Sequence, residues 1–203
     1  VPDDLPLDEA VALLADGRTA VMMLQAVEPR PGERVLVEAA AGGVGTLLVQ
    51  LAKTAGATVV AAAGGPRKVN VALRQGADEA VDYSEPGWTQ KAGKVDVVLD
   101  GVGGDVAREA FTLLGEGGRM VSFGLASGEW ANIPEDEAAA RGVTLVRAEA
   151  TPEELREFTR TALTSGLRPL IGQRFPLERA ADAHAAIESR ATVGKTLLEV
   201  RRR

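Results

Sequence analysis

A glycine-rich turn between an apolar strand and a helix constrains this chain more than any other feature. The predicted strand 34–39 runs into Ala40-Ala41-Gly42-Gly43-Val44-Gly45, and a helix follows from about residue 44 to residue 55. The spacing matches G-x-G-x-x-G, with Ala40 in the first glycine position. In such a unit Gly42 lets the backbone approach a pyrophosphate, Gly45 lets the helix pack closely on the strand, and the helix N-terminus faces the phosphates. The turn predicts a dinucleotide site, with a tight turn in a ligand-free flavodoxin-like domain as the alternative.

The rest of the chain alternates apolar strands with helices, and residues 124–138 have the composition of a loop. Further strands are expected at 58–63, 80–83, 95–100, 119–123, 143–146 and 196–200. Further helices are expected at 7–27 with a break at Gly17, and at 66–75, 105–114, 151–165 and 177–189. Nearly continuous apolar strands are typical of a parallel sheet covered on both faces. We therefore predict an α/β fold, a doubly wound parallel sheet (Rossmann fold) in three α/β/α layers. It would form one domain, 1–203, with a leading helical segment 1–28 and a C-terminal segment 170–203.

The end of the second strand bears on which nicotinamide cofactor would bind. A domain that prefers NAD usually carries an acid about 20 residues after the glycine turn, but no acid occurs between Thr46 and Ala77. Gly64 and Gly65 instead lead into a helix that opens with Pro66, Arg67 and Lys68. Two cations beside a helix N-terminus suit a 2′-phosphate and predict NADP(H). The alternative is that Arg67 and Lys68 are solvated surface charges.

Composition excludes several classes of function. The net charge is −6, which argues against a nucleic-acid-binding surface. The chain has no cysteine and only His184, so we expect neither a disulfide nor a metal site. No signal peptide is recognised, and no apolar run is expected to reach the length of a membrane span. The absence of cysteine fits a cytoplasmic location. We expect the terminal run of arginines, 201–203, to be solvated.

A resemblance to a known family extends these expectations. Residues 39–45 resemble the A-A-x-G-G-V-G turn of medium-chain dehydrogenases of the zinc-free quinone oxidoreductase type. The resemblance continues in order along nearly the whole chain. Its further motifs are Arg18-Thr19-Ala20, residues 31–37, Gly76-Ala77-Asp78, Val81-Asp82-Tyr83, residues 100–104, residues 118–124, Phe175-Pro176-Leu177, Ala183-His184, residues 188–192 and Gly194-Lys195.

The resemblance implies roles for residues at matching positions. The pyrophosphate would meet the backbone N–H groups of Gly43 and Val44, within the turn Ala41, Gly42, Gly43, Val44, Gly45. The 2′-phosphate would meet Lys68 and Tyr83, with Arg190 as a further candidate, near Gly64 and Arg67. The family often has a serine near Gly64 and Gly65, so one phosphate donor is missing here. The nicotinamide end would lie along Val102, Phe123, Gly124 and Leu125.

Structural alternatives stay open at several of these positions. Tyr83 could be a half-buried aromatic of an edge strand, Phe123 could belong to the core, and Arg190 could cap a helix C-terminus. We interpret His184 as a packing residue and Asp100 as the organiser of a turn rather than a base. No catalytic residue is identified.

The function implied is hydride transfer from NADPH to a quinone, enone or similar conjugated carbonyl. Nothing in the chain resembles the family's N-terminal β-rich domain, so we expect this chain alone to be incomplete for catalysis. The alternatives are a non-enzymatic NADPH sensor or scaffold module and the cofactor domain of an alcohol dehydrogenase-like enzyme. With its normal partner absent, the strand 196–200 is expected to be able to pair with another copy, which would give a homodimer.

Overall fold

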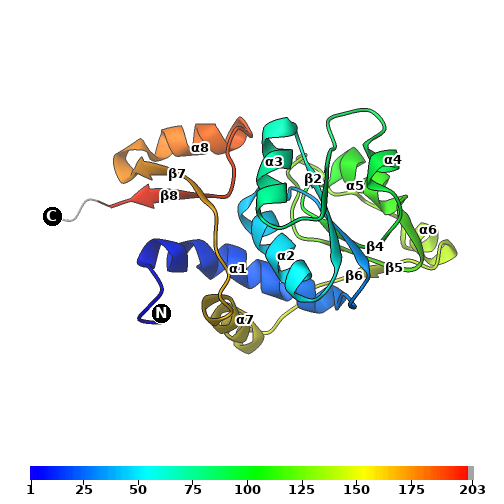
Figure 1. Cartoon of the computed structure of the whole chain (residues 1–203), viewed down its shortest axis with the longest axis horizontal. Helices are drawn as coiled ribbons and strands as arrows, with labels where there is room; N and C mark the ends of the chain where they lie inside the picture. Colours follow the sequence, from blue (N-terminus) through cyan, green and yellow to red (C-terminus); the bar gives the residue numbers. More distant parts are fainter. Residues whose placement is uncertain (201–203) are drawn as a thin grey trace.

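The computed structural model describes residues 1–200, so the terminal run of arginines lies outside the described residues. Figure 1 shows a sheet flanked by helices, with a smaller unit beside it. The strands are β1 Arg34–Val37, β2 Thr58–Ala63, β3 Glu79–Asp82, β4 Val95–Asp100, β5 Leu114–Ser122, β6 Thr144–Val146, β7 Ile171–Pro176 and β8 Lys195–Glu199. The α-helices are α1 Leu7–Val27, α2 Gly43–Thr54, α3 Pro66–Arg74, α4 Trp88–Ala92, α5 Gly104–Phe111, α6 Glu135–Ala140, α7 Pro152–Thr164 and α8 Ala180–Glu188, with a 3₁₀ turn at Leu177–Arg179.

The main sheet confirms the predicted fold class. Its six strands lie in the order β3-β2-β1-β4-β5-β6 and all pairs are parallel. This is the order of a doubly wound dinucleotide-binding fold. Successive strands are added toward one edge up to β3 and toward the other edge from β4, so the strand order reverses between β1 and β4. Ligands of such sheets bind at the carboxyl ends of the strands beside this reversal.

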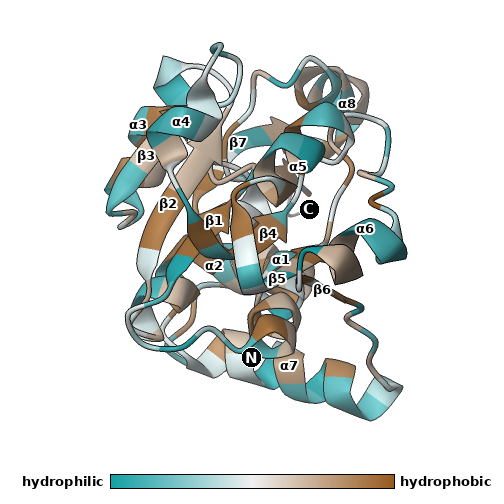
Figure 2. Ribbon diagram, turned by 90° about the vertical axis from the view of Figure 1, so that its right-hand side faces the viewer, coloured by the Kyte–Doolittle hydropathy of each residue, from teal (hydrophilic) through white to brown (hydrophobic). Residues whose placement is uncertain are grey.

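The sheet is buried on both faces because its strands are apolar at successive positions. Val35 and Val37 of β1 pack into a core with residues of α1 and α2, whereas Leu36 packs into a second core with residues of α4 and α5. Figure 2 shows the result, in which the hydrophobic strands β1, β2 and β4 lie inside and the more polar helices lie around them. The helices thus cover both faces, as a parallel sheet requires.

Helix α1 differs from two expectations. It continues without a break through Gly17, because Gly17 gives α7 room: a Cβ added there would lie 2.9 Å from the Cβ of Ala162. The expectation that no segment reaches the length of a membrane span is also wrong by length and composition, since α1 has a mean hydropathy of 1.3 over 18 residues. One face of the helix, with Leu13, Ala20, Met23 and Val27, nevertheless packs in the core with α2, whereas Leu7, Val11 and Leu14 are exposed.

Three elements escape prediction from the sequence, and several boundaries differ. The three are strand β7, helix α4 and helix α6, although Trp88 and Ala92 of α4 are buried in the second core. Strand β5 begins at Leu114, which the sequence pattern assigns to the preceding helix. The loop before β6 contains α6. A capping box opens α7, since Thr151 Oγ1 accepts a hydrogen bond from the Glu154 amide and Glu154 accepts one from the Thr151 amide.

The C-terminal strand has a partner within the chain. Strand β8 pairs in parallel with β7 to form a separate two-stranded sheet under α8, beside the N-terminal half of α1 (Figure 1). One edge of β8 is therefore paired, contrary to the expectation that the strand has no partner within this chain. The segment before β8 also reaches the glycine turn after β1, because the Gly194 amide donates to the Ala41 carbonyl at 2.7 Å.

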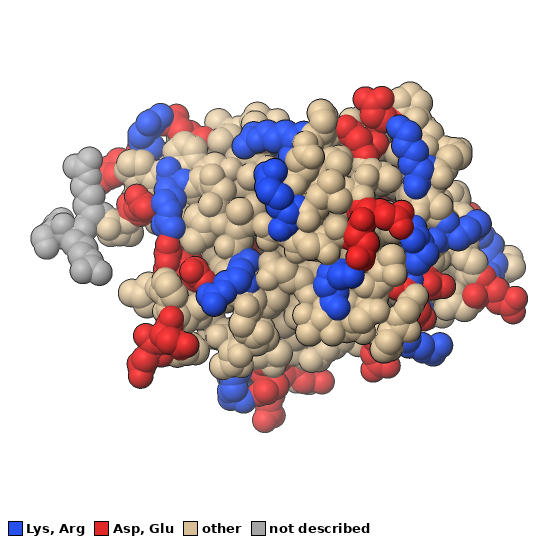
Figure 3. All heavy atoms as spheres, in the orientation of Figure 1, with Lys and Arg blue, Asp and Glu red and all other residues tan. Residues whose placement is uncertain are grey.

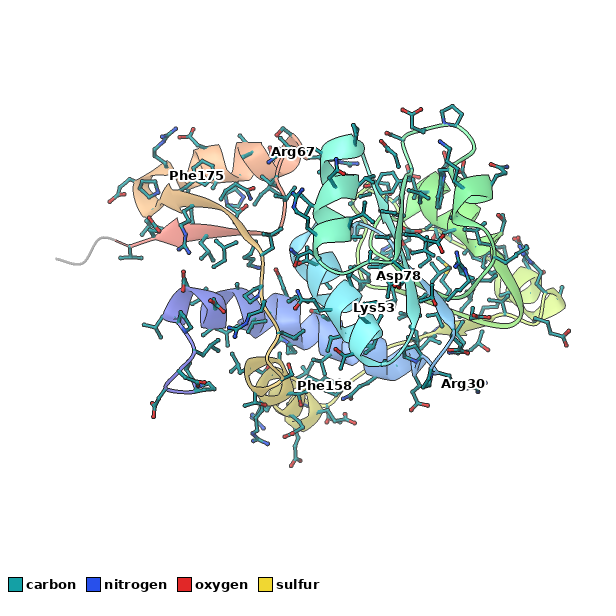
Figure 4. All side chains as sticks on the ribbon, in the orientation of Figure 1. Arg30, Lys53, Arg67, Asp78, Phe158 and Phe175 are labelled. Atoms are coloured by element: carbon teal, nitrogen blue, oxygen red, sulfur yellow. The ribbon has the colours of Figure 1, made fainter. Side chains whose placement is uncertain are left out.

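Charged side chains connect elements and are spread over the surface. Lys53 of α2 and Asp78 before β3 point toward each other in Figure 4, with 2.7 Å between Nζ and Oδ1. Hydrogen bonding from Lys53 holds the pKa of Asp78 below its usual value. On the face shown in Figure 3, basic and acidic side chains are interspersed rather than gathered into a patch of one sign.

Candidate functional site

The glycine turn between β1 and α2 is the base of the candidate site. Ala39 adopts a left-handed conformation with φ +47°, and the Gly42 amide donates to the Ala39 carbonyl at 2.8 Å, which closes the turn. Gly42 is the N-cap of α2, and no side chain caps this helix end. The first amides of α2 therefore remain available for an anion, and the helix dipole favours one there.

The glycines of the turn have the spatial roles expected of the motif. A Cβ at Gly45 would overlap the carbonyl oxygen of Ala39 and lie 2.8 Å from the Cα of Ala40, so only glycine lets α2 approach the turn this closely. A Cβ at Gly42 would lie 3.2 Å from the Ala39 oxygen, with no other heavy atom within 4 Å. Gly42 therefore borders open space on the side where a pyrophosphate would lie.

The end of β2 supplies the second part of the site. Gly65 has φ +91° and is the N-cap of α3, so glycine is required by the backbone there. The ring of Tyr83, which follows β3, covers Gly64: a Cβ added to Gly64 would lie 3.0 Å from Cε2 of Tyr83. Asp82 fixes this corner, because its Oδ1 accepts hydrogen bonds from the amides of Gly65 and Ser84 at 2.8 and 2.9 Å.

The C-terminal segment closes over the same strand ends. Lys68 Nζ donates to the carbonyl oxygen of Arg190 at 2.6 Å, and Arg67 Nη1 donates to that of Ala191 at 3.1 Å. Figure 4 shows Arg67 at the gap between α3 and the end of α8. Arg190 itself has φ +55° and ends the turn after α8. Three candidate cations therefore meet at one place from two distant parts of the sequence.

A cavity of about 170 Å³ lies among these groups. It is lined by Ala39, Ala41, Gly42, Ala63, Gly64, Lys68, Tyr83, Ala126, Ile187, Arg190 and Thr192. A larger groove of about 720 Å³ lies between α1 and the β7–β8 sheet, with Leu7, Val11 and Leu198 in its walls. We take the smaller cavity as the candidate site because it adjoins the glycine turn and the start of α3.

The electrostatics of the cavity follow from its cations and its partial burial. Burial lowers the pKa of Lys68, and the positive charges of Arg190 and Arg67 lower it further. Burial raises the pKa of Tyr83, and the carboxyl group of Glu38 contributes in the same direction. An anion between these cations would relieve their mutual repulsion, so the cavity suits a phosphate better than a neutral group.

The predicted nicotinamide residues lie away from this cavity, at the ends of β4 and β5. Val102 is buried, while Leu125 is 43% exposed. The Phe123 ring packs on Gly101, where a Cβ would lie 2.6 Å from Cζ, and it also contacts the first core. Gly124 passes close to the Gly101 carbonyl. These four residues thus follow β4 and β5 at the carboxyl edge of the sheet.

The structure brings together most of the predicted residues and adds some. Ala41, Gly42, Gly64, Lys68, Tyr83 and Arg190 line the cavity, whereas Gly43, Val44 and Gly45 form the adjoining helix start and Arg67 is held at the edge. Ile187 and Thr192 escape prediction from the sequence, because only the return of the C-terminal segment places them there. Asp100 organises a turn, since its Oδ1 accepts from the amides of Val102 and Gly103 at 2.9 and 2.7 Å.

Within residues 1–200 no group of three or more His, Cys, Asp or Glu side chains is placed to hold a metal ion. The candidate site thus combines glycines at a helix start with a lysine, a tyrosine and Arg190, groups whose chemistry suits a phosphate.

Comparison with known proteins places this arrangement in a family. A family model described as zinc-binding dehydrogenase matches residues 75–198. A probable quinone oxidoreductase of Schizosaccharomyces pombe is 37% identical over 98% of this chain. The quinone oxidoreductase of Escherichia coli, solved in complex with NADPH, superposes with a TM-score of 0.86 at 31% identity, over 98% of this chain and 67% of that one.

A quinone oxidoreductase of Thermus thermophilus, studied alone and with NADPH, superposes with a TM-score of 0.83 at 36% identity, over 96% of this chain and 67% of that one. The chain spans 64% of the length of the S. pombe relative, so it matches about two thirds of these proteins. The fold, the glycine turn and these matches agree: the chain belongs to the medium-chain dehydrogenase/reductase superfamily, among its quinone oxidoreductase-like members, and corresponds to their cofactor-binding part.

Proposed function

We propose that this chain is the NADP(H)-binding domain of a zinc-independent oxidoreductase that transfers hydride to a quinone, enone or similar conjugated carbonyl. The observation that carries the proposal is the cavity between the glycine turn and the start of α3. Lys68, Tyr83 and Arg190 line it, and the uncapped N-terminus of α2 adjoins it. The E. coli and T. thermophilus relatives, whose structures with NADPH are known, support the same proposal.

The preference for NADP(H) over NAD(H) follows from the charge at the end of β2. Lys68, Arg67 and Arg190 converge there, and the carboxylate of Asp82 is engaged by the amides of Gly65 and Ser84 and by the Ser84 hydroxyl. A 2′-phosphate would meet charge-assisted donors at this point, whereas a ribose 2′-hydroxyl would find no free acid.

The residues of this chain would bind and orient the cofactor rather than act on the substrate. When bound, the nicotinamide supplies the hydride. The amides of Gly43 and Val44 would hold the pyrophosphate, Lys68 and Tyr83 the 2′-phosphate. Val102, Phe123, Gly124 and Leu125 would hold the nicotinamide end against the strand reversal. No acid–base residue is proposed in this chain.

Calorimetric titration with NADPH and NADH tests the binding. The chain should bind NADPH more tightly than NADH, and equal or reversed affinities would refute the assignment of the 2′-phosphate site. Steady-state assays with NADPH and a simple quinone, with and without a chelator, then test the reaction. Hydride transfer needs an acceptor held about 3–3.5 Å from the nicotinamide in an aligned pocket. We expect this chain to bind NADPH yet turn quinones over poorly, and a longer protein with a preceding domain to be active without added zinc.

Two further results would redirect the proposal. NADPH binding without turnover in the longer protein would favour a sensor or scaffold, and zinc-dependent alcohol oxidation would favour an alcohol dehydrogenase-like enzyme. We also propose a cytoplasmic location, and a homodimer as the form to be sought by size measurement.

A further inference from the structure

One carboxyl group lies in the interior without a hydrogen-bond partner. Glu38 directly follows β1, its side chain is 0% exposed, and neither of its carboxyl oxygens has a partner among the described residues. An ionised carboxylate in such a place is strongly disfavoured, whereas a protonated one can act as a hydrogen-bond donor. Glu38 stands at the carboxyl end of β1, where the strand runs into the glycine turn.

A second carboxyl group lies beside it. The Glu38 amide donates to the Leu99 carbonyl at 3.0 Å, which sets Glu38 beside the end of β4, and Asp100 there is also 0% exposed. Asp100 is already held as an acceptor. Its Oδ1 accepts from the amides of Val102 and Gly103, and its Oδ2 from Ser122 Oγ at 2.6 Å. Two carboxyl groups can form a hydrogen bond only if one of them is protonated, and Glu38 is the one free to carry the proton.

The surroundings favour this proton. Burial raises the pKa of Glu38 well above its usual value, the carboxyl of Asp100 raises it further, and the Val102 amide acts in the opposite direction. Burial raises the pKa of Tyr83, which follows β3, and the carboxyl group of Glu38 raises it further. Within residues 1–200, no lysine, arginine or histidine forms an ion pair with Glu38 or Asp100.

We propose that Glu38 is a neutral carboxylic acid that donates a hydrogen bond to Asp100, and that this pair positions the turn 101–104 at the nicotinamide end of the site. The role of the turn rests on the proposed function; the pair itself does not. Asp100 holds the amides of Val102 and Gly103, so whatever displaces Asp100 also displaces the turn. Loss of the proton, as the pH rises past the folded-state pKa of Glu38, would set two negative charges side by side in the interior.

The pH dependence has a definite sign. The pKa of Glu38 is higher in the folded than in the unfolded chain, where its ordinary value is 4.5. The folded chain therefore holds a proton that the unfolded chain has released. The stability contributed by Glu38 is fully present below pH 4.5 and is lost as the pH rises toward the folded-state value. Glu38→Gln keeps the shape of the neutral acid and its ability to donate, but cannot lose a proton.

Thermal unfolding without cofactor, measured between about pH 5 and about pH 9, tests the pair. The Tm advantage of Glu38→Gln over the wild type should grow as the pH rises, and the exposed Glu85→Gln should follow the wild type. Parallel profiles for Glu38→Gln and the wild type, or a uniform loss at every pH, would overturn the proposal. Infrared spectroscopy of the wild type gives a readout that needs no variant. A protonated-carboxyl band should persist above the pH at which exposed carboxyl groups are ionised and should vanish on unfolding, and its absence throughout that range would also overturn the proposal.

NADPH titrations across the same pH range separate the two proposals. Wild-type affinity should weaken above the folded-state pKa of Glu38 by at most about tenfold per pH unit, since one proton is involved, and Glu38→Gln should keep its affinity. If NADPH binds but the two unfolding profiles are parallel, the pair is refuted and the proposed function stands. If the unfolding profiles differ as expected but NADPH does not bind at any pH, the proposed function is refuted and the pair stands.

Discussion

Replacing Lys68 with alanine should weaken NADPH binding and leave NADH binding almost unchanged. Lys68 is half-buried in the wall of the cavity, and its ammonium group is held at the Arg190 carbonyl, 2.6 Å away. A charge-assisted hydrogen bond to a phosphate contributes about 1.5–3 kcal/mol. The loss corresponds to roughly a ten- to hundredfold rise in the Kd of NADPH. NADH lacks the 2′-phosphate, so its Kd should rise little.

Calorimetry on the wild type and variant, with both cofactors at one fixed salt concentration, measures this difference. Arg74→Ala is the matched control, because Arg74 is an exposed cation at the other end of the same helix. It removes the same charge from α3 without touching the cavity. An equal loss of affinity for NADPH and NADH in Lys68→Ala would refute the 2′-phosphate assignment. An equal effect of Arg74→Ala and Lys68→Ala would show a general charge effect instead of a contact.

Two further predictions concern the turn and the stability of the fold. Gly42→Val should abolish NADPH binding, because the valine side chain would fill the open space above the turn. Circular dichroism and Tm should remain close to those of the wild type. A folded variant that still binds NADPH normally would exclude the turn as the phosphate site. Burial raises the pKa of Glu33, but hydrogen bonds from Arg119 and the Arg30 amide outweigh it and leave the pKa below its ordinary 4.5. The stability that ionised Glu33 contributes is present above pH 4.5 and is lost as the pH falls through the folded-state pKa. Between about pH 6 and about pH 3, the Tm of Glu33→Gln should therefore fall less than the Tm of the wild type. Identical slopes would show that the pair with Arg119 contributes nothing.

The sheet is predictable because local signals and tertiary structure agree there. The strands 58–63 and 95–100 have their predicted bounds, since each is a continuous apolar run that needs burial on both faces. The turn also lies where the glycine spacing predicts it, but the spacing does not predict which residue of the turn is left-handed. Ala40, the departure from the glycine pattern, is fully buried without positive φ, whereas Ala39 carries the left-handed conformation. Sequence spacing locates a turn without saying which residue bears its unusual dihedral angle.

The errors arise where tertiary packing overrides a local signal. Gly17 normally weakens a helix, but in α1 its missing side chain lets α7 pack closely, so the helix continues. Strand β7 has only a weak apolar alternation, and it is stabilised by pairing with β8 after an intervening helix. The burial of Glu38 is visible only when the ends of β1 and β4 are seen side by side, although a glutamate closing an apolar strand is an unusual signal in the sequence.

The candidate site depends on a segment that leaves the sheet and returns to it. The motif at the turn and the cations on α3 can be located from the sequence. The cavity also needs another wall, which is formed by Ile187, Arg190 and Thr192 from more than 100 positions away. The return is fixed at the turn itself, because the Gly194 amide donates to the Ala41 carbonyl. Gly194 has φ +58°, and a Cβ there would lie 2.8 Å from the carbonyl carbon of Leu170, so the approach requires glycine. Gly194, directly before β8, therefore matters for the cofactor site although it does not line the cavity: it holds the C-terminal wall against the glycine turn.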